Sequence, residues 1–166
     1  MPNRRTFLQS AASLPFLIQT AKSQAASSDP LLQAKKEPVL KLDSFNSPII
    51  IDSIELFRAN NEFFVKTTSK DGAVGVSITN NRASYLYPIL DRLVIPHFKG
   101  KDARDLESLV DKAYLFKNNY KIAGLALWCP VAWVEMSILD MLGQIAKKSV
   151  GELFGGIIRR EIPIYC

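Results

Sequence analysis

The segment Ala132–Lys147 constrains the fold most, because its apolar residues lie around most of a helical circumference. One stripe of the predicted helix is formed by Val134, Ile138, Met141, Leu142 and Ile145, whereas its other sides carry Trp133, Met136 and Leu139. A helix that is apolar on several sides must be buried against more than one partner. We therefore expect a central, buried helix that begins just after Pro130, and a partner outside this chain that covers one of its sides.

Three strands are predicted before the helices, at Ile49–Arg58, Glu62–Thr68 and Val74–Thr79. The Asn60-Asn61 pair between the first two tolerates positive φ, which is typical of a tight hairpin. Lys70-Asp71-Gly72 supplies a second turn before the third strand. These signals predict a three-stranded antiparallel meander, which needs a helical layer on one face to be stable.

Two more helices are predicted between the sheet and the central helix. Tyr87–Ile95 is apolar, and Pro88 suits the first position of a helix. Asp102 is a suitable N-cap for a helix whose apolar residues follow a helical period, namely Leu106, Leu109, Val110, Ala113 and Tyr114. The whole pattern predicts an α+β fold in which a helical bundle follows the meander.

Residues 1–25 resemble a twin-arginine export signal. Arg4 and Arg5 are followed by one variable residue and then by Phe7 and Leu8, with a mildly apolar stretch after them. This stretch is shorter than the ~20 apolar residues that span a bilayer. Small residues also precede a cleavage position after Ala25. We therefore expect the chain to be exported by the twin-arginine pathway and to act in the periplasm or outside the cell.

The basic character of the chain comes largely from this N-terminal segment. The formal net charge is +5, but three of the 21 basic residues and none of the 16 acidic residues fall within residues 1–25, which leaves +2 for the rest. No Lys/Arg stripe alternates with aromatic residues, so nucleic-acid binding is not expected. Residues 26–48 are polar and contain three prolines, and they are predicted to be a linker that wraps around the domain or frays.

Several short motifs in the globular part resemble those of one enzyme family. The turn Asp71-Gly72 followed by Gly75 resembles DGxxGxGE, although Ser77-Ile78 replaces the usual Gly-Glu. Pro96 with residues 99–102 resembles P-x-(I/L)-x-G-x-D.

Three further motifs follow along the last third of the chain. Glu135 and Leu139-Asp140 with Gly143-Gln144 resemble (D/E)xALWDxxGK, with Gln144 in place of the usual Lys. Residues 152–156 resemble ELLGG, and Ile162–Tyr165 resembles the first strand of a barrel. In this order, the motifs resemble the N-terminal capping domain of the enolase superfamily, of the mandelate racemase/muconate lactonizing enzyme type.

The resemblance implies a capping domain at residues 49–156 and, at residues 157–166, the start of a (β/α)8 barrel that is truncated at its first strand. In the family, acidic residues at barrel strand ends hold Mg²⁺, and Lys or His bases remove a proton α to a carboxylate. None of those positions matches a residue of this chain, so no catalytic or metal-binding residue is assigned. The implied parent enzyme is a racemase, epimerase, cycloisomerase or acid-sugar dehydratase. It would use Mg²⁺, act on a small carboxylate and form a homo-oligomer with the missing barrel in place.

The capping domain of the family closes over the substrate with two loops. The first has shrunk here to Asn60-Asn61, which is too short for a lid, and the second corresponds to Asn80, Asn81 and Arg82. The fork of Arg82 suits a substrate carboxylate, and the alternative interpretation is an exposed arginine beside an asparagine helix cap. His97 and Asp140 are interpreted as structural residues. The alternative hypothesis for the whole chain is a stand-alone, exported α+β binding domain without catalysis.

Overall fold

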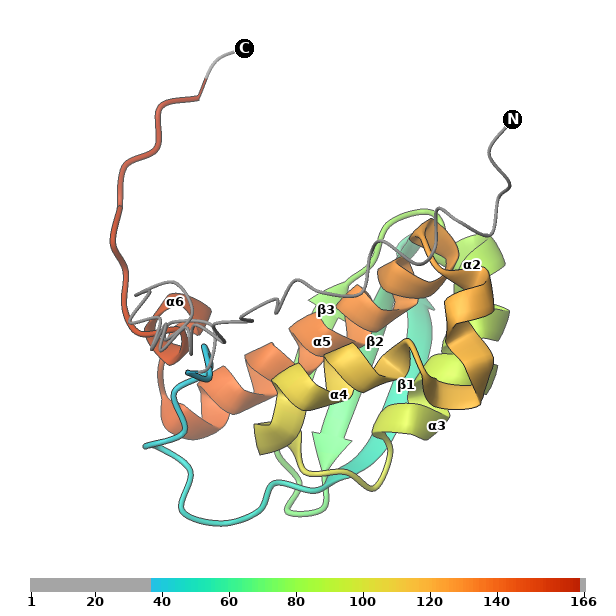
Figure 1. Ribbon diagram of the computed structural model, residues 1–166. Coiled ribbons are helices and arrows are strands. Elements are labelled where there is room, and N and C mark those ends of the chain that lie inside the picture. The colour runs from blue at the N-terminus through green and yellow to red at the C-terminus, as the bar shows by residue number, and fades with distance from the viewer. Residues whose placement is uncertain (1–36, 165–166) are drawn as a thin grey trace, which may run out of the picture. The chain divides into compact units, whose positions relative to one another are not determined.

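A computed structural model describes residues 37–164. The predicted export signal of residues 1–25, the first part of the linker, Tyr165 and Cys166 lie outside the described residues. Strands β1 (Ile51–Ala59), β2 (Glu62–Ser69) and β3 (Val74–Ile78) form an antiparallel sheet in the order β1-β2-β3. Helices follow the sheet and pack against it (Figure 1). The predicted three-stranded meander followed by helices is confirmed.

Both predicted turns are formed by residues that accept a left-handed backbone. Asn60 has φ 48° and Asn61 has φ 68°, which is the geometry of the tight hairpin expected between β1 and β2. Gly72 has φ 84° in the turn before β3. A β-bulge interrupts the pairing of β1 with β2 between Ile51 and Ser53, so the first residues of β1 are offset from the regular alternation.

The first helical region begins earlier than predicted. Helix α2 spans Ala83–Ile89, a π-helical turn η1 spans Leu90–Val94, and α3 spans Ile95–Phe98. Pro88 lies inside α2 instead of at its first position, so the predicted start was wrong. The helix starts where the carbonyls of Asn80, Asn81 and Arg82 accept hydrogen bonds from the N–H groups of residues 83–86. Prolines remove an N–H and clash with the preceding turn of an α-helix. The wider π turn lies between Pro88 of α2 and Pro96, the second residue of α3.

The next helix is capped as predicted. The Asp102 carboxylate accepts a hydrogen bond from the Arg104 N–H at 3.1 Å, at the start of the 3₁₀ turn η2 (Ala103–Asp105) that leads into α4 (Leu106–Ala113). Leu106, Leu109 and Ala113 are buried on one side of α4. The 3₁₀ segment η3 (Phe116–Ile122) then connects α4 to the central helix.

The central helix α5 spans Leu125–Ala146 and begins before Pro130 instead of after it. Gly124, with φ 104°, ends the preceding loop and permits this earlier start. Pro130 therefore lies in the second turn of α5, where it removes one intrahelical hydrogen bond. By length and composition α5 would also suit a membrane span, but 56% of its most apolar window is buried inside the protein, as in a core helix.

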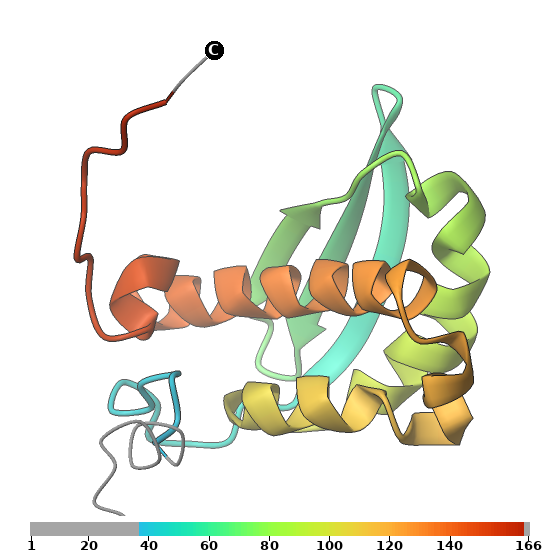
Figure 2. The same cartoon turned by 45° about the horizontal axis from the view of Figure 1, so that its top comes forward.

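Helix α5 crosses the strands and packs mainly against β3 and β2, with α2 and α4 on its flanks (Figure 2). Trp133 and Leu139, which lie off the main stripe, are 5% and 3% exposed. The expectation that a partner outside the chain must cover these two residues was therefore wrong, because the protein already buries both. Met136 is 55% exposed and is the off-stripe residue that remains uncovered among the described residues.

The described part of the linker, residues 37–48, wraps against the domain. Leu40 and Phe45 are buried, the Lys41 N–H donates to the Leu153 carbonyl at 2.8 Å, and the Leu40 N–H donates to Glu107 at 2.6 Å. Of the two behaviours considered for the linker, wrapping is therefore the one that this part shows.

After α5 comes the short helix α6 (Val150–Leu153), which begins with a capping box between Ser149 and Glu152. Gly155 and Gly156, at φ 101° and 123°, end it as predicted. The predicted strand at Ile162–Tyr165 is not formed in its described part, since residues 157–164 pair with no strand and are exposed. A β-strand needs a neighbour for its backbone hydrogen bonds, and no described residue supplies one there.

Candidate functional site

The predicted lid segment Asn80–Arg82 connects β3 to α2 and is exposed. The Asn80 side chain accepts the Arg82 N–H at 3.1 Å, and the Ser84 hydroxyl donates to the Asn81 carbonyl at 2.7 Å. These contacts fix the backbone of the turn at the start of the helix. Arg82 takes the N-cap position but makes no side-chain capping hydrogen bond. Its guanidinium forms no ion pair with any residue of 37–164.

The β1–β2 hairpin tip lies at the same end of the sheet as Asn80–Arg82. The Thr79 N–H donates to the Phe63 carbonyl at 2.8 Å, which joins the segment after β3 to the start of β2. At the tip, the Arg58 guanidinium donates to Asn61 and lies 5.4 Å from the Phe63 ring centroid. The tip is therefore a short, internally bonded turn.

His97 is buried at the end of α3, and its ring lies against a backbone carbonyl and two aromatic rings. Its Nε2 lies 2.7 Å from the Leu109 carbonyl on α4, and because a carbonyl can only accept, Nε2 carries the proton. The ring also lies 5.0 Å from Phe98 and 5.1 Å from Phe116, measured between centroids. No described carboxylate bonds to this ring, so the geometry favours the structural interpretation over a general base.

Asp140 binds the free edge of the sheet. Its Oδ2 accepts the Val76 N–H of β3 at 2.8 Å and the Gln144 side chain at 3.4 Å. Since Val76 donates to α5, its N–H points away from β2. The carboxylate thus caps a backbone N–H, which fits the structural interpretation of Asp140.

We expect Asp140→Ala to destabilise the protein by about 1–3 kcal/mol, the usual range for a lost hydrogen bond to a charged group. The Val76 amide should exchange faster with solvent, as measured by NMR hydrogen exchange. Asp140→Asn is the matched control, because its carboxamide oxygen still accepts the same N–H and should keep most of the protection. Equal Val76 exchange rates in the two variants would contradict this role.

The sequence did not reveal the small polar contacts that join the sheet to α5. The hydroxyls of Thr67 and Ser137 lie 2.6 Å apart, and Ser77 donates to the Trp133 carbonyl at 2.6 Å. Ser77 stands where the family motif has glycine. The small residue at this position is the sequence feature that could have indicated the contact with α5. Its hydroxyl is satisfied by α5, which explains how a polar residue is tolerated in a buried position.

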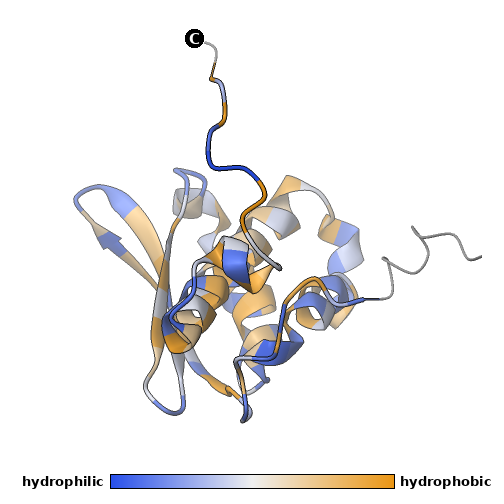
Figure 3. Ribbon diagram, turned by 90° about the vertical axis from the view of Figure 1, so that its left-hand side faces the viewer, coloured by the Kyte–Doolittle hydropathy of each residue, from blue (hydrophilic) through white to orange (hydrophobic). Residues whose placement is uncertain are grey.

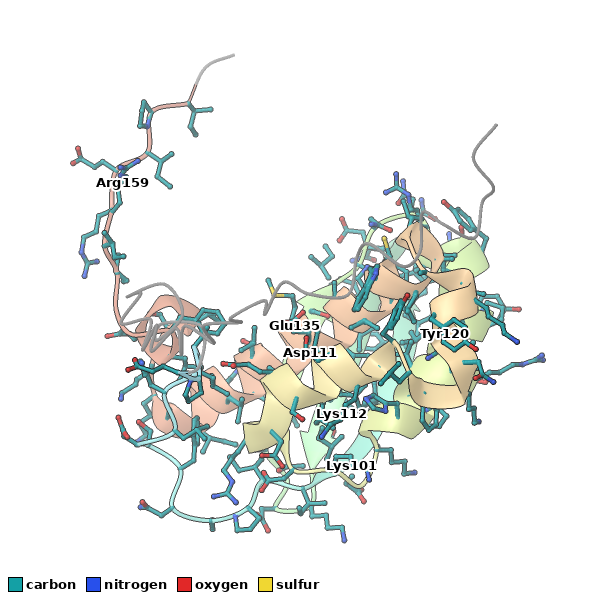
Figure 4. All side chains as sticks on the ribbon, in the orientation of Figure 1. Lys101, Asp111, Lys112, Tyr120, Glu135 and Arg159 are labelled. Carbon is teal, nitrogen blue, oxygen red and sulfur yellow. The ribbon has the colours of Figure 1, made fainter. Side chains whose placement is uncertain are left out.

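Glu135 lies on the α4 side of α5 and is half-buried, and Asp111 of α4 is labelled beside it in Figure 4. Burial raises the pKa of the Glu135 carboxyl above its ordinary value. Because the folded state then holds this proton more tightly than the unfolded chain, the ionised carboxylate is a net cost to folding as pH rises above the ordinary pKa.

A surface pocket of about 480 Å³ lies between α3, the loop after it and α4. Three lysines line it, namely Lys99, Lys101 and Lys112, and Figure 4 shows the last two coming from the loop and from α4. Two acids are also present, Asp102 and Asp105. Burial alone would raise the pKa of Asp102, but hydrogen bonds from Arg104 and from the Ile49 N–H outweigh it and hold the pKa below its usual value. The lid residues do not line this pocket.

Within residues 37–164, no group of three His, Cys, Asp or Glu side chains is placed to hold a metal ion. The described residues therefore do not fit the Mg²⁺ site that the family resemblance implies for a parent enzyme. No chemical step through a metal is assigned to them.

No family model matches the chain, but individual proteins do. A D-mannonate dehydratase from Caulobacter vibrioides is 28% identical over 120 residues, which are 70% of this chain and 29% of that protein. A D-mannonate dehydratase from a Sphingomonas species is 31% identical over 122 residues, which are 71% of this chain and 30% of that protein. The chain thus spans about 30% of the length of these curated relatives.

Solved structures share the fold. A muconate cycloisomerase from Azorhizobium caulinodans matches with a TM-score of 0.60 and 23% identity, over 72% of this chain and 34% of its own. A mandelate racemase/muconate lactonizing protein from Paracoccus denitrificans matches with a TM-score of 0.59 and 19% identity, over 67% and 31%. The Paracoccus protein has also been solved in complex with magnesium. The chain therefore has the fold of the N-terminal domain of mandelate racemase/muconate lactonizing enzymes, and at the level of the family it matches the enolase superfamily.

Proposed function

We propose that residues 49–156 are the capping, substrate-lid domain of a Mg²⁺-dependent enzyme that removes a proton α to a carboxylate. The observation that carries this proposal is the joint match of fold and sequence over about two thirds of the chain. Both curated relatives named above are D-mannonate dehydratases, so an acid-sugar dehydratase is the favoured member of the racemase, epimerase, cycloisomerase and dehydratase set.

Arg82 is the residue proposed to face the substrate. It is exposed at the N-terminus of α2, its backbone is fixed by Asn80, and its guanidinium has no acidic partner in the described part of the chain. A planar guanidinium binds a carboxylate with two parallel hydrogen bonds. Asn80 and Asn81 would position it. The metal ligands and the proton-abstracting base would lie in a barrel domain that residues 37–164 do not contain.

Export by the twin-arginine pathway is part of the same proposal and rests on Arg4, Arg5, Phe7 and Leu8. It predicts that an Arg4→Lys, Arg5→Lys variant accumulates in the cytoplasm of a host with that pathway, and fractionation would measure this. Equal amounts of both forms in the periplasm would contradict it.

The capping role is tested by reading the gene beyond the codon for Cys166. We expect an open reading frame that encodes alternating strands and helices with three spaced acidic residues and a Lys-x-Lys pair. The protein from that full frame should dehydrate D-mannonate when Mg²⁺ is added. A stop codon directly after Cys166 would instead support the stand-alone binding domain.

In the full protein, Arg82→Ala should lower kcat/KM for the acid sugar by about 100-fold, as expected for a lost charge-assisted contact of ~2–3 kcal/mol. Arg92→Ala is the matched control, because Arg92 is exposed on η1 and should leave kinetics unchanged. Identical kinetics for the two variants would remove Arg82 from the site without affecting the family assignment.

A further inference from the structure

The pocket of about 480 Å³ between α3 and α4 lies within the helical layer of the domain. Figure 3 shows the helices on one side of the sheet only, and the outer face of the sheet, which the helices leave uncovered, takes no part in this pocket. The lining residues come from α3, the loop after it, η2, α4 and η3. None of them belongs to the Asn80–Arg82 segment, so the pocket is separate from the proposed lid.

Positive charge exceeds negative charge at this pocket. Lys99, Lys101 and Lys112 line it, against the carboxylates of Asp102 and Asp105. None of the three lysines forms an ion pair with any residue of 37–164. Lys101 comes from the loop and Lys112 from α4 (Figure 4), so positive charge is supplied from two sides of the pocket.

The charge of Asp102 is already offset by an arginine that does not line the pocket. The Arg104 Nε and a terminal guanidinium nitrogen donate to Asp102 Oδ2 at 3.0 and 2.8 Å. The Ile49 N–H donates to the other oxygen of the same carboxylate at 3.0 Å. Asp105 is then the one lining acid that opposes the three lysines, which leaves two positive charges in excess.

The backbone that carries Lys99 and Lys101 is fixed on both sides of Gly100. The Gly100 N–H donates to the Ile51 carbonyl at 2.8 Å, and the Ile51 N–H donates to the Lys101 carbonyl at 2.9 Å. The Lys99 N–H donates to the Ile95 carbonyl at 2.9 Å at the end of α3. Because β1 and α3 hold this loop in place, a ligand that binds between the lysines need not order the backbone.

Apolar side chains form the remaining wall of the pocket. Pro96, Leu109 and Phe116 line it together with His97. The His97 ring is held by the Leu109 carbonyl, 2.7 Å from Nε2, and its centroid lies 5.1 Å from that of Phe116. A concave site with apolar walls and a few charged groups is typical of small-molecule binding.

We propose that this pocket binds a phosphate group, carried by a small phosphorylated molecule or present as the free ion. Lysine ammonium groups bind phosphate as point charges, whereas a planar carboxylate is matched best by the fork of an arginine. Three lysines and no arginine are among the described lining residues, and the two excess positive charges match a phosphate dianion. The apolar wall offers a surface to the organic part of a phosphate ester.

This inference goes beyond the proposed capping function and does not depend on it. The lid residues do not line the pocket, and every residue that the argument uses lies in the described part of the chain. Binding can therefore be measured without the chemistry of a full-length enzyme.

The single histidine of the chain provides a direct readout of occupancy. Because His97 lines the pocket, its ring signals in NMR spectra report on this site. The whole chain is titrated with phenyl phosphate, inorganic phosphate and phenol at constant pH and ionic strength. We expect both phosphates to shift the His97 ring signals saturably, and phenol to leave them unchanged. Tighter binding of the ester would identify a phosphorylated small molecule as the ligand, and equal binding would identify the free ion.

Two substitutions in the pocket test the contribution of its lysines. Lys101→Gln and Lys112→Gln should each weaken phosphate binding about fivefold, as expected for one lost contact between partly exposed charges. Lys101→Arg keeps the charge and should retain most of the affinity. Lys121→Gln is the matched control, because Lys121 is exposed on η3 but does not line the pocket. It should change the affinity less than about twofold, since solvent and salt screen more distant charges.

Circular dichroism of each variant establishes that it is folded. The proposal would be overturned if neither phosphate shifted the His97 ring signals, or if phenol shifted them equally. Equal weakening by Lys121→Gln and Lys101→Gln would also overturn it, because binding would then follow the general surface charge. None of these results would bear on the catalytic test of the full reading frame.

Discussion

Replacing Gly75 with alanine is expected to destabilise the domain by roughly 3 kcal/mol or more, at or above the upper end of the usual cost of overpacking a core. A Cβ at position 75 would lie 2.1 Å from the Ser137 carbonyl oxygen and 2.3 Å from the Met141 backbone nitrogen. Both neighbours belong to the backbone of α5, so no side-chain rotation can relieve the contact. Either β3 or the whole helix must move away.

Urea unfolding followed by circular dichroism measures the effect as a lower midpoint at an unchanged slope. The control is Val74→Ala on the same strand, because Val74 is 39% exposed on the opposite face and its truncation should cost well under about 1 kcal/mol. A Gly75→Ala midpoint close to that of the control would show that α5 does not cross β3 as closely as described.

Replacing Phe98 with alanine is expected to cost about 3–5 kcal/mol, the usual range for a fully buried phenylalanine. Phe98 is 0% exposed at the end of α3, and its ring meets His97 edge-on at 5.0 Å between centroids. The lost stability combines the transfer free energy of the deleted ring atoms with the cost of the cavity that remains. The His97 contact with the Leu109 carbonyl should also loosen.

Phe57→Ala provides the comparison for Phe98, since the same atoms are removed from a residue that is 41% exposed. We expect a change below about 1 kcal/mol in the free energy of unfolding. Similar destabilisation by both substitutions would show that the outer face of the sheet is part of the folding core.

The strands were predictable because local signals decide them. The Asn pair and Gly72 take the left-handed conformations that their residue types favour, and the runs between them alternate or are apolar. The helix starts were not predictable from proline positions. Pro88 and Pro130 both lie inside helices, because hydrogen bonds in the preceding turn and the backbone of Gly124 set those starts, and these are not visible as a periodic pattern.

The site was predictable only in part, for a similar reason. The sequence identified Asp140 as a structural carboxylate, and the fold supplies its partner, an N–H on a strand 64 positions earlier in the chain. The burial of Trp133 and Leu139 depends on how other elements pack around α5, which the pattern of a single helix does not reveal. The predicted strand after Gly156 is absent from the described residues because strands form only with a neighbour.

The close crossing of β3 and α5 at Gly75 also determines which parts of the domain can move. Backbone contact at Gly75, the Ser77 bond to Trp133 and the Asp140 bond to Val76 join the strand and the helix at three successive points. Strand β3 and helix α5 must therefore move together as one rigid unit. Any movement of Arg82 that is independent of β3 has to originate in the four residues 79–82, a connection that contains no glycine.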